Sequence, residues 1–193
     1  MNDPVVNATQ RACGRRVMID PRDREYGYTP KKATSKRTKR YWTTNTYFYD
    51  QGYKSVCVGG GWSHWLWNNP IRQWLEPEGI YGLAQYLDEW PGQSYEGTSV
   101  RAGAKVLKML GFIERYEWVH DINTLVLSLL EKGPVVVGTN WYEGMMNPCK
   151  GLMRADGEVL GGHCYLLDGV DTTKKQFRAK NSYGTSWGSG GRA

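Results

Sequence analysis

The chain has 193 residues, of which 40% are hydrophobic and 23% charged, and its net charge is +6. This length suits one domain or two small lobes that share an interface, and the composition is ordinary for a soluble globular protein. No apolar run approaches the ~20 residues that span a bilayer, and the N-terminus lacks the apolar core of a signal peptide. These observations exclude a membrane-spanning protein and favour a cytoplasmic one.

The positive charge is concentrated near the N-terminus. Residues 1–50 contain eleven Lys or Arg against five Asp or Glu, and this difference equals the whole net charge. We interpret residues 1–41 as a basic N-terminal arm that is partly disordered, because the arm shows no lasting hydrophobic period. Through residues 11–40 it could contact nucleic acid or an acidic partner. The simpler interpretation is a solvated leader.

The cysteines indicate a reducing compartment. Cys13, Cys57, Cys149 and Cys164 show no paired metal spacing such as C-x-x-C. In a chain without an export signal, such cysteines are typically free thiols. We therefore expect neither a disulfide framework nor a cysteine-bound metal.

The first expected helix covers residues 55–67, with Ser55 as a possible N-cap. Gly59, Gly60 and Gly61 argue against it, because each costs roughly 1 kcal/mol relative to Ala in a helix. If the helix forms, tertiary packing must hold it. The small residues would then allow another backbone to come close.

Three further helices are expected at 78–90, 98–110 and 121–132, where apolar residues recur at helical spacing. Thr98 or Ser99 can cap the second of these helices, and Asp121 can cap the third. After Pro134 the sequence pattern changes to short runs rich in β-forming residues, which are separated by turn residues. These runs are PVVVGTNW, HCYLLDGV and QFRAKNSYG. Helices followed by strands predict an α+β fold with segregated halves.

The three histidines differ in their surroundings. His64 lies between tryptophans and is typical of a core histidine, while His120 precedes a helix cap and is expected in solvent. His163 follows two glycines, begins a strand-like run and precedes Asn181 by eighteen residues. It is therefore the best candidate for a base that works near neutral pH.

Three stretches together resemble the papain-like cysteine peptidases. DQGYKSVC ends at Cys57, GGHCYLLDGVD contains His163, and KNSYGTSWG contains Asn181. They are similar to the family's glutamine-glycine turn with its cysteine, its histidine strand and its asparagine segment, and they occur in the family's order. The resemblance, which covers roughly residues 42–191, is to a bacterial or phage-type member without an inhibitory propeptide.

The resemblance implies a papain-like two-lobe fold. A helical lobe at 42–113 would carry the nucleophile, and an antiparallel β-barrel-like lobe at 114–193 would carry the histidine and the asparagine. It implies a cysteine endopeptidase, a hydrolase that cleaves a protein or peptide substrate without a metal or organic cofactor. We expect the chain to be a monomer.

The resemblance also assigns roles, each with a physical reason. Cys57 would be the nucleophile, since a helix N-terminus and a neighbouring His163 favour the thiolate and allow an ion pair. Asn181 would orient the imidazole without taking its proton. Gln51 would donate a hydrogen bond to the oxyanion. Trp187 would cover the bond between the asparagine and the histidine.

Four positions are expected to contact the substrate, and Trp187 is one of them. Gly97 and Thr98 fall where the family has a glycine pair that binds the peptide backbone. Gly162 falls where the residue before the histidine lines the cleft. Because Gly162 has no side chain, this position contributes no charge that could select a substrate.

The sequence also departs from the family. Val58 replaces a nearly constant tryptophan and precedes the glycine run, Tyr183 replaces another tryptophan, and Lys54 replaces a disulfide cysteine of secreted members. The family's inhibitory propeptide is a long helical domain, which the forty irregular N-terminal residues cannot form. The sequence stops where the family continues into closing strands, so we expect a trimmed lobe or a fragment.

Two alternatives to the peptidase follow from these departures. One is a catalytically weak papain-like binding module whose basic arm contacts nucleic acid or another partner. The other is acyl transfer by the same residues, in which an amine takes the acyl group in place of water.

Overall fold

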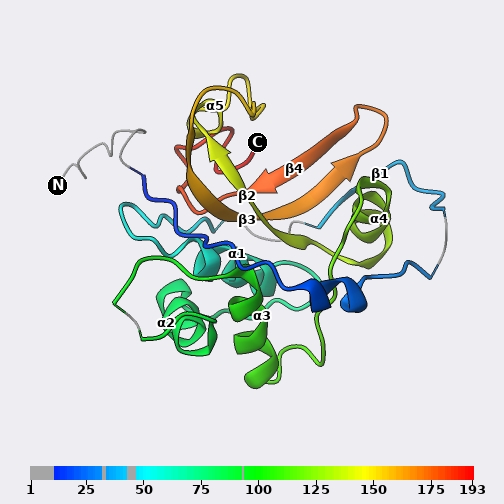
Figure 1. The fold of residues 1–193 in the computed structure, drawn as a ribbon. Coiled ribbons are helices and arrows are strands. Elements are labelled where there is room, and N and C mark those ends of the chain that lie inside the picture. Colours follow the sequence, from blue (N-terminus) through cyan, green and yellow to red (C-terminus); the bar gives the residue numbers. More distant parts are fainter. Residues whose placement is uncertain (1–10, 32–33, 43–46, 93) are drawn as a thin grey trace.

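The computed structural model describes residues 11–31, 34–42, 47–92 and 94–193. Helices α1 (Cys57–Trp67), α2 (Pro77–Leu87) and α3 (Val100–Met109) pack together in one half, and an antiparallel sheet forms the other half (Figure 1). This arrangement is the predicted α+β fold with segregated halves. Among the described residues, no helix is long and apolar enough to cross a bilayer.

The sheet is organised around one long strand, β3 (Val159–Asp171). Strand β2 (Val135–Tyr142) pairs with its first part, while β1 (Lys39–Tyr41) and β4 (Gln176–Lys180) pair with its second part, and all three ladders are antiparallel. The ladder with β4 shifts its register between Leu167 and Gly169. Such an irregularity increases the local bend and twist of a strand, which curls this sheet.

Two short helical segments join the halves. Helix α4 (Ile122–Leu127) continues as the π-turn η3 (Ser128–Lys132), so the helix predicted at 121–132 forms with a change of period. Asp121 caps it as expected, accepting a hydrogen bond of 2.9 Å from the backbone N–H of Thr124. The remaining elements are η2 (Pro21–Tyr26) and α5 (Glu143–Met146).

The cap of α1 differs from the expectation. The helix begins at Cys57, and Ser55 Oγ donates a 2.6 Å hydrogen bond to the Glu96 carboxylate in place of capping the helix. The cap of α3 is Ser99, whose Oγ accepts a hydrogen bond from the Ala102 N–H at 3.1 Å. Side-chain capping therefore helps to define the start of α3, whereas the start of α1 is set by packing.

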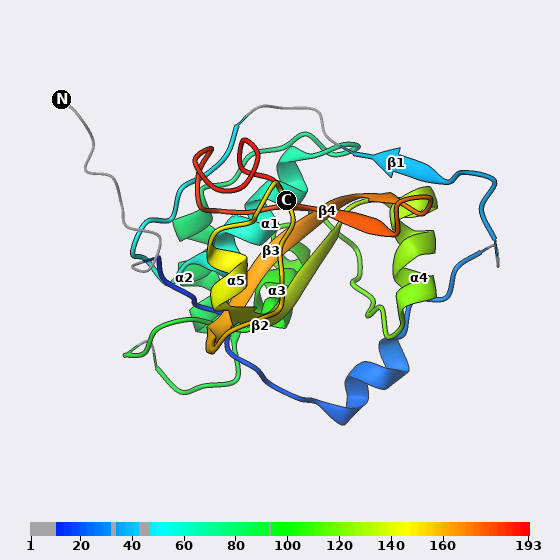
Figure 2. The ribbon, with the colours of Figure 1, turned by 90° about the horizontal axis from the view of Figure 1, so that it is seen from above.

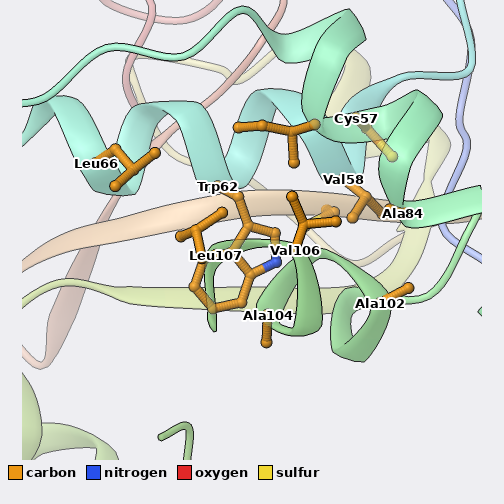
Figure 3. Packing of buried hydrophobic residues seen from close by; sticks show 11 residues of the cluster. Cys57, Val58, Trp62, Leu66, Ala84, Ala102, Ala104, Val106 and Leu107 are labelled. Atoms are coloured by element: carbon orange, nitrogen blue, oxygen red, sulfur yellow. The ribbon is translucent and has the colours of Figure 1, made fainter. Parts of the chain in front are cut away.

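Two hydrophobic cores correspond to the two halves. The first joins α1, α2 and α3 and includes Val58, which is fully buried against Gly103 of α3 (Figure 3). The second lies on the sheet around Trp141 and Tyr183. Because Val58 fills the space beside a glycine of α3, a small side chain at this position is part of the packing.

The glycine run of α1 allows three close approaches. A Cβ on Gly59 would lie 2.0 Å from the Pro77 carbonyl oxygen, one on Gly60 would lie 2.8 Å from Ser182 Cβ, and one on Gly61 would lie 2.9 Å from Cys164 Sγ. These neighbours belong to α2, to the segment after Asn181 and to β3. Gly59 thus allows another backbone to come close, as predicted, while Gly60 and Gly61 allow side-chain atoms to do so.

The described residues of the arm expected at 1–41, which are 11–31 and 34–41, pack against the rest of the chain, whereas residues 1–10 lie outside the described residues. Residues 39–41 form β1 and belong to the sheet, while residues 11–28 run along the helical half and the sheet (Figures 1 and 2). Arg15 bridges to Thr98, and Gly27 bridges to Trp118. The buried Arg101 of α3 forms ion pairs with Asp20 and Asp23. The hydrophobic periodicity of the sequence did not predict this packing, because backbone hydrogen bonds and ion pairs hold these residues.

Candidate active site

Cys57 is the first residue of α1, where backbone N–H groups and the helix dipole favour a negative charge. Its side chain is fully buried. Figure 3 shows it at the end of the helix, beyond the apolar side chains that pack against α3. The packing of α1 against α2 and β3, made possible by its glycines, therefore positions the thiol.

His163 and Asn181 form the predicted pair. The His163 ring Nε2 lies 2.8 Å from Asn181 Oδ1, and both residues are fully buried. The Ser182 N–H also donates to Asn181 Oδ1 at 2.8 Å, which identifies that atom as the amide oxygen. Nε2 therefore carries the proton in a neutral ring, and Nδ1 is left as an acceptor. No described side chain or backbone group hydrogen-bonds to Nδ1.

Aromatic rings enclose His163. The ring centroid of Trp141 lies 4.4 Å from that of His163, and the Tyr183 centroid lies at 4.8 Å. Trp187 lies behind these rings, 6.2 Å from Trp141 and 6.4 Å from Tyr183. The predicted cover over the histidine is thus formed directly by Trp141 and Tyr183.

Sequence reasoning missed Trp141. The feature that places Trp141 on the same face as His163 is the register of β2 on β3. Thr139 pairs with His163, and Trp141 follows two residues later on the same face of β2. That register becomes readable only once the two strands are known to pair.

Gln51 is 2% exposed and is oriented by three hydrogen bonds. Its Oε1 accepts from Ser182 Oγ at 2.6 Å, and its Nε2 donates to the Lys54 carbonyl at 2.8 Å and to the Ala12 carbonyl at 2.9 Å. The first bond ties Gln51 to the residue after Asn181. The third shows that Nε2 can bind the carbonyl oxygen of a peptide, as an oxyanion donor must.

Residues 12–16, here called the covering segment, lie across the site. Gly14 and Arg15 donate their N–H groups to the Gly162 carbonyl at 3.1 and 2.9 Å. Thr98 donates to the Gly14 carbonyl at 3.0 Å and accepts from the Arg16 N–H at 2.8 Å. In the described structure, the backbone positions predicted to contact substrate therefore bind this segment.

Glycines allow the covering segment to approach closely. A Cβ on Gly14 would lie 2.0 Å from the Ser55 carbonyl oxygen, and one on Gly162 would lie 2.1 Å from the Arg15 carbonyl oxygen. Gly97 has φ +83, and a Cβ there would lie 2.4 Å from the Gly14 carbonyl oxygen. Three of the predicted contact residues, Gly97, Thr98 and Gly162, are thus brought together by the fold.

Burial disfavours the charged forms of both Cys57 and His163. Burial raises the pKa of the Cys57 thiol to about 12, although the N–H groups of Cys164 and Gly14 act in the opposite direction. Burial lowers the pKa of His163 to about 4, despite its hydrogen bond to Asn181. In this covered arrangement, burial therefore acts against both charges of the expected ion pair.

Comparison with known proteins supports the fold. No protein-family model matches the chain. It is 27% identical over 133 residues to gamete and mating-type specific protein A of Dictyostelium discoideum. That match covers 68% of the chain but 27% of the relative, so the chain spans about a quarter of the relative's length.

Several solved structures are similar over nearly the whole chain. Xylellain, a cysteine protease from Xylella fastidiosa, has a TM-score of 0.74 at 21% identity over 95% of this chain and 88% of that chain. Procathepsin B S9 from Trypanosoma congolense has a TM-score of 0.64 at 13% identity, with coverages of 96% and 80%. Procathepsin L 3 from the Tenebrio molitor larval midgut has a TM-score of 0.62 at 13% identity, with coverages of 96% and 70%. The chain therefore has the papain-like fold of these cysteine proteases.

Proposed function

We propose that the chain is a cysteine endopeptidase with Cys57 as nucleophile and His163 as base. The observation that carries the proposal is the 2.8 Å hydrogen bond between His163 Nε2 and Asn181 Oδ1. It leaves Nδ1 as a proton acceptor on a ring held by its neighbours. The backbone N–H of Cys164, the residue next to His163, acts to lower the pKa of the Cys57 thiol, which supports a site shared by nucleophile and base.

The arrangement supports a complete acyl-transfer cycle. His163 Nδ1 takes the thiol proton as Cys57 attacks the substrate carbonyl carbon. The oxyanion would accept hydrogen bonds from Gln51 Nε2 and from the Cys57 N–H. The imidazolium then protonates the leaving amine, and a water activated by His163 releases the acid. Attack by an amine in place of water would give the alternative acyl transfer.

For the chain to act as the proposed peptidase, the covering segment must leave the site. The Ala12 carbonyl occupies the Gln51 donor, and Gly14 and Arg15 occupy the Gly162 carbonyl that a substrate backbone would use. Displacing the segment would also rehydrate the site. Rehydration lowers the pKa of Cys57 and raises that of His163, which favours the reactive ion pair.

The full chain and its Gly14→Ala variant provide the test. The added Cβ would meet the Ser55 carbonyl, so we expect it to displace the covering segment and to speed iodoacetamide labelling of Cys57. We then expect the variant to hydrolyse members of a peptide library, with all activity lost on adding Cys57→Ala. Rapid labelling of Cys57 without any hydrolysis would overturn the peptidase proposal.

The contacts of the arm do not favour the alternative of a nucleic-acid-binding module. Arg11 pairs with Asp50 at 2.6 Å and Arg37 pairs with Glu131 at 2.8 Å. The Arg16 guanidinium lies 4.3 Å from the centroid of the Trp90 ring. These cations bind groups of the same chain, so contact with phosphates would have to replace existing interactions.

A further inference from the structure

The side chain of Arg15, in the covering segment, lies against one face of the sheet beside the candidate base. Strand β2 contributes Gly138 and Asn140 to this face, and β3 contributes Gly162, which pairs directly with Asn140. Residues two apart on a strand, and residues directly opposite on paired strands, share a face. Because Gly162 precedes His163 in the chain, this face adjoins the candidate active site.

Two glycines leave room here for a long side chain. A Cβ on Gly138 would lie 2.5 Å from Arg15 Cδ and 2.8 Å from Cγ2 of Val100, at the start of α3. A Cβ on Gly162 would lie 3.1 Å from Arg15 Nε. The methylenes of Arg15 therefore pass through a groove between the sheet and α3, in space that any larger residue at position 138 would fill. We call it the Arg15 groove, and Gly138, Asn140, Gly162 and Val100 define it.

The end of the Arg15 groove carries a hydrogen-bond acceptor. Arg15 Nη2 donates to Asn140 Oδ1 at 3.4 Å, which is a long hydrogen bond. No described group accepts a hydrogen bond from the buried Arg15 Nε. The guanidinium is thus only partly satisfied, so the covering segment does not use all that the groove offers. A lysine would carry a methylene at the position of Nε and would leave no donor unpaired there.

We propose that the Arg15 groove is a specificity site for a long basic side chain of the substrate, arginine or lysine, and that Arg15 occupies it in the covered state. Gly138 admits the length of such a side chain, and Asn140 Oδ1 accepts a hydrogen bond from its end. The biological role of the groove rests on the proposed peptidase function. Its binding preference can be measured without hydrolysis.

Binding of a peptide to an opened chain tests this preference. The protein carries Gly14→Ala and Arg15→Ala, to displace the covering segment and free the groove, and Cys57→Ala, to prevent turnover. The probe is a fluorescent peptide that copies residues 11–16 with Cys13→Ser. We expect its affinity to fall at least about tenfold with Arg15→Ala in the peptide, and at least about threefold with Arg15→Met, which has no donor. Arg15→Lys should change the affinity by less than about threefold. Equal affinities of these peptides, or no binding by any of them, would overturn the proposal.

Variants of the groove show where the preference arises. Gly138→Ala in the protein should weaken the arginine peptide at least about tenfold and leave the Arg15→Ala peptide unchanged, because the added Cβ takes the space of the long side chain. Gly133→Ala is the matched control, since no atom lies within 4 Å of the position of its Cβ. Equal weakening of both peptides by Gly138→Ala would contradict the assigned groove.

A second variant changes the charge of the groove and preserves its shape. Asn140→Asp places a carboxylate opposite the end of the basic side chain, and we expect it to tighten the arginine peptide at least about threefold. The Arg15→Met peptide should bind the Asn140→Asp variant no better than it binds the parent protein. Equal gains for the two peptides would overturn the role of Asn140.

The groove and the peptidase can fail separately. A positional-scanning peptide library is offered to the chain that carries Gly14→Ala and Arg15→Ala but retains Cys57. We expect cleavage to be at least about tenfold faster when arginine or lysine occupies one particular position. A binding preference without hydrolysis would support the groove and remove the peptidase. Hydrolysis without a basic preference at any position would retain the peptidase and overturn the groove.

Discussion

Asn181 Oδ1 accepts hydrogen bonds from both the His163 ring and the Ser182 backbone. The second bond prevents the amide from rotating to present its NH₂ group to the ring. The ring is also held between Trp141 and Tyr183, so its orientation has two sources. The amide sets the tautomer and the aromatic rings exclude water, and these contributions can be separated by mutation.

Replacing Asn181 should change the pH dependence as well as the rate. In the Gly14→Ala background, we expect Asn181→Ala to lower kcat/KM about 10²-fold, because the ring loses its tautomer control. Asn181→Asp should instead shift the alkaline limb of the kcat/KM profile to higher pH, since a carboxylate stabilises the imidazolium of the reactive ion pair. An unchanged profile in both variants, with the fold intact by circular dichroism, would refute this role.

The reactivity of Cys57 in the full chain should depend strongly on pH. Its pKa is raised to about 12, so the thiol is protonated at neutral pH and the thiolate fraction grows about tenfold per pH unit below the pKa. We expect the rate of iodoacetamide labelling to follow this slope between pH 7 and 10. In Gly14→Ala the curve should level off at a lower pH. A flat, fast profile in the unmodified chain would contradict the covered state.

At the scale of elements, α1 illustrates how packing outweighs helix propensity. Three glycines weaken the helix locally, and Val56 provides no side-chain cap. Each glycine nevertheless faces an atom closer than a Cβ could tolerate. Helix α3 is the opposite case, since its apolar spacing and Ser99 cap made its start readable from the sequence.

A matched pair of glycine substitutions tests this balance. Gly82 of α2 is exposed, and no atom lies within 4 Å of the position that a Cβ would occupy there, so Gly82→Ala should stabilise the protein by about 0.5–1 kcal/mol. Gly59→Ala has the same intrinsic gain but would clash with the Pro77 carbonyl, and we expect a net loss of about 1–3 kcal/mol. Urea unfolding measures both. Changes of the same sign would contradict the packing explanation.

At the scale of the whole molecule, the N-terminal residues connect the two halves. The covering segment binds Gln51 and Thr98 from the helical half and Gly162 from the sheet. Further along, Arg101 of α3 forms ion pairs with Asp20, Asp23 and Glu89. These contacts form a cover over the site without a helical domain, which the irregular sequence of these residues did not predict.

Removing the Arg101 cation should loosen this cover. Arg101→Met leaves three carboxylates without their buried partner, and we expect tryptic cleavage within residues 22–37 and labelling of Cys57 to rise by at least about tenfold. Arg115→Met is the control, because Arg115 is exposed and pairs only loosely with Glu117, at 3.5 Å. Equal labelling rates in the two variants would show that the ion pairs do not hold the cover.

The sequence by itself determined much of this protein. Apolar periodicity, caps and β-rich runs predicted α3, α4 and strands β2, β3 and β4, and three short motifs gave Cys57, His163, Asn181 and Gln51 as candidate site residues. Those signals are local, since each depends on residues within a few positions of one another. A fold class and a list of candidate residues are therefore readable without coordinates.

The tertiary structure alone decided the state of the site. The contacts between Ala12 and Gln51 and between Gly14 and Gly162 join residues far apart in the chain, and no local pattern encodes such pairing. Cys57 and His163 are fully buried in this fold, and burial shifts the pKa of each toward its neutral form. The residue types thus determine which chemical groups the site contains, while long-range packing determines how well water solvates them. Solvation in turn decides whether the cysteine and the histidine can carry charge.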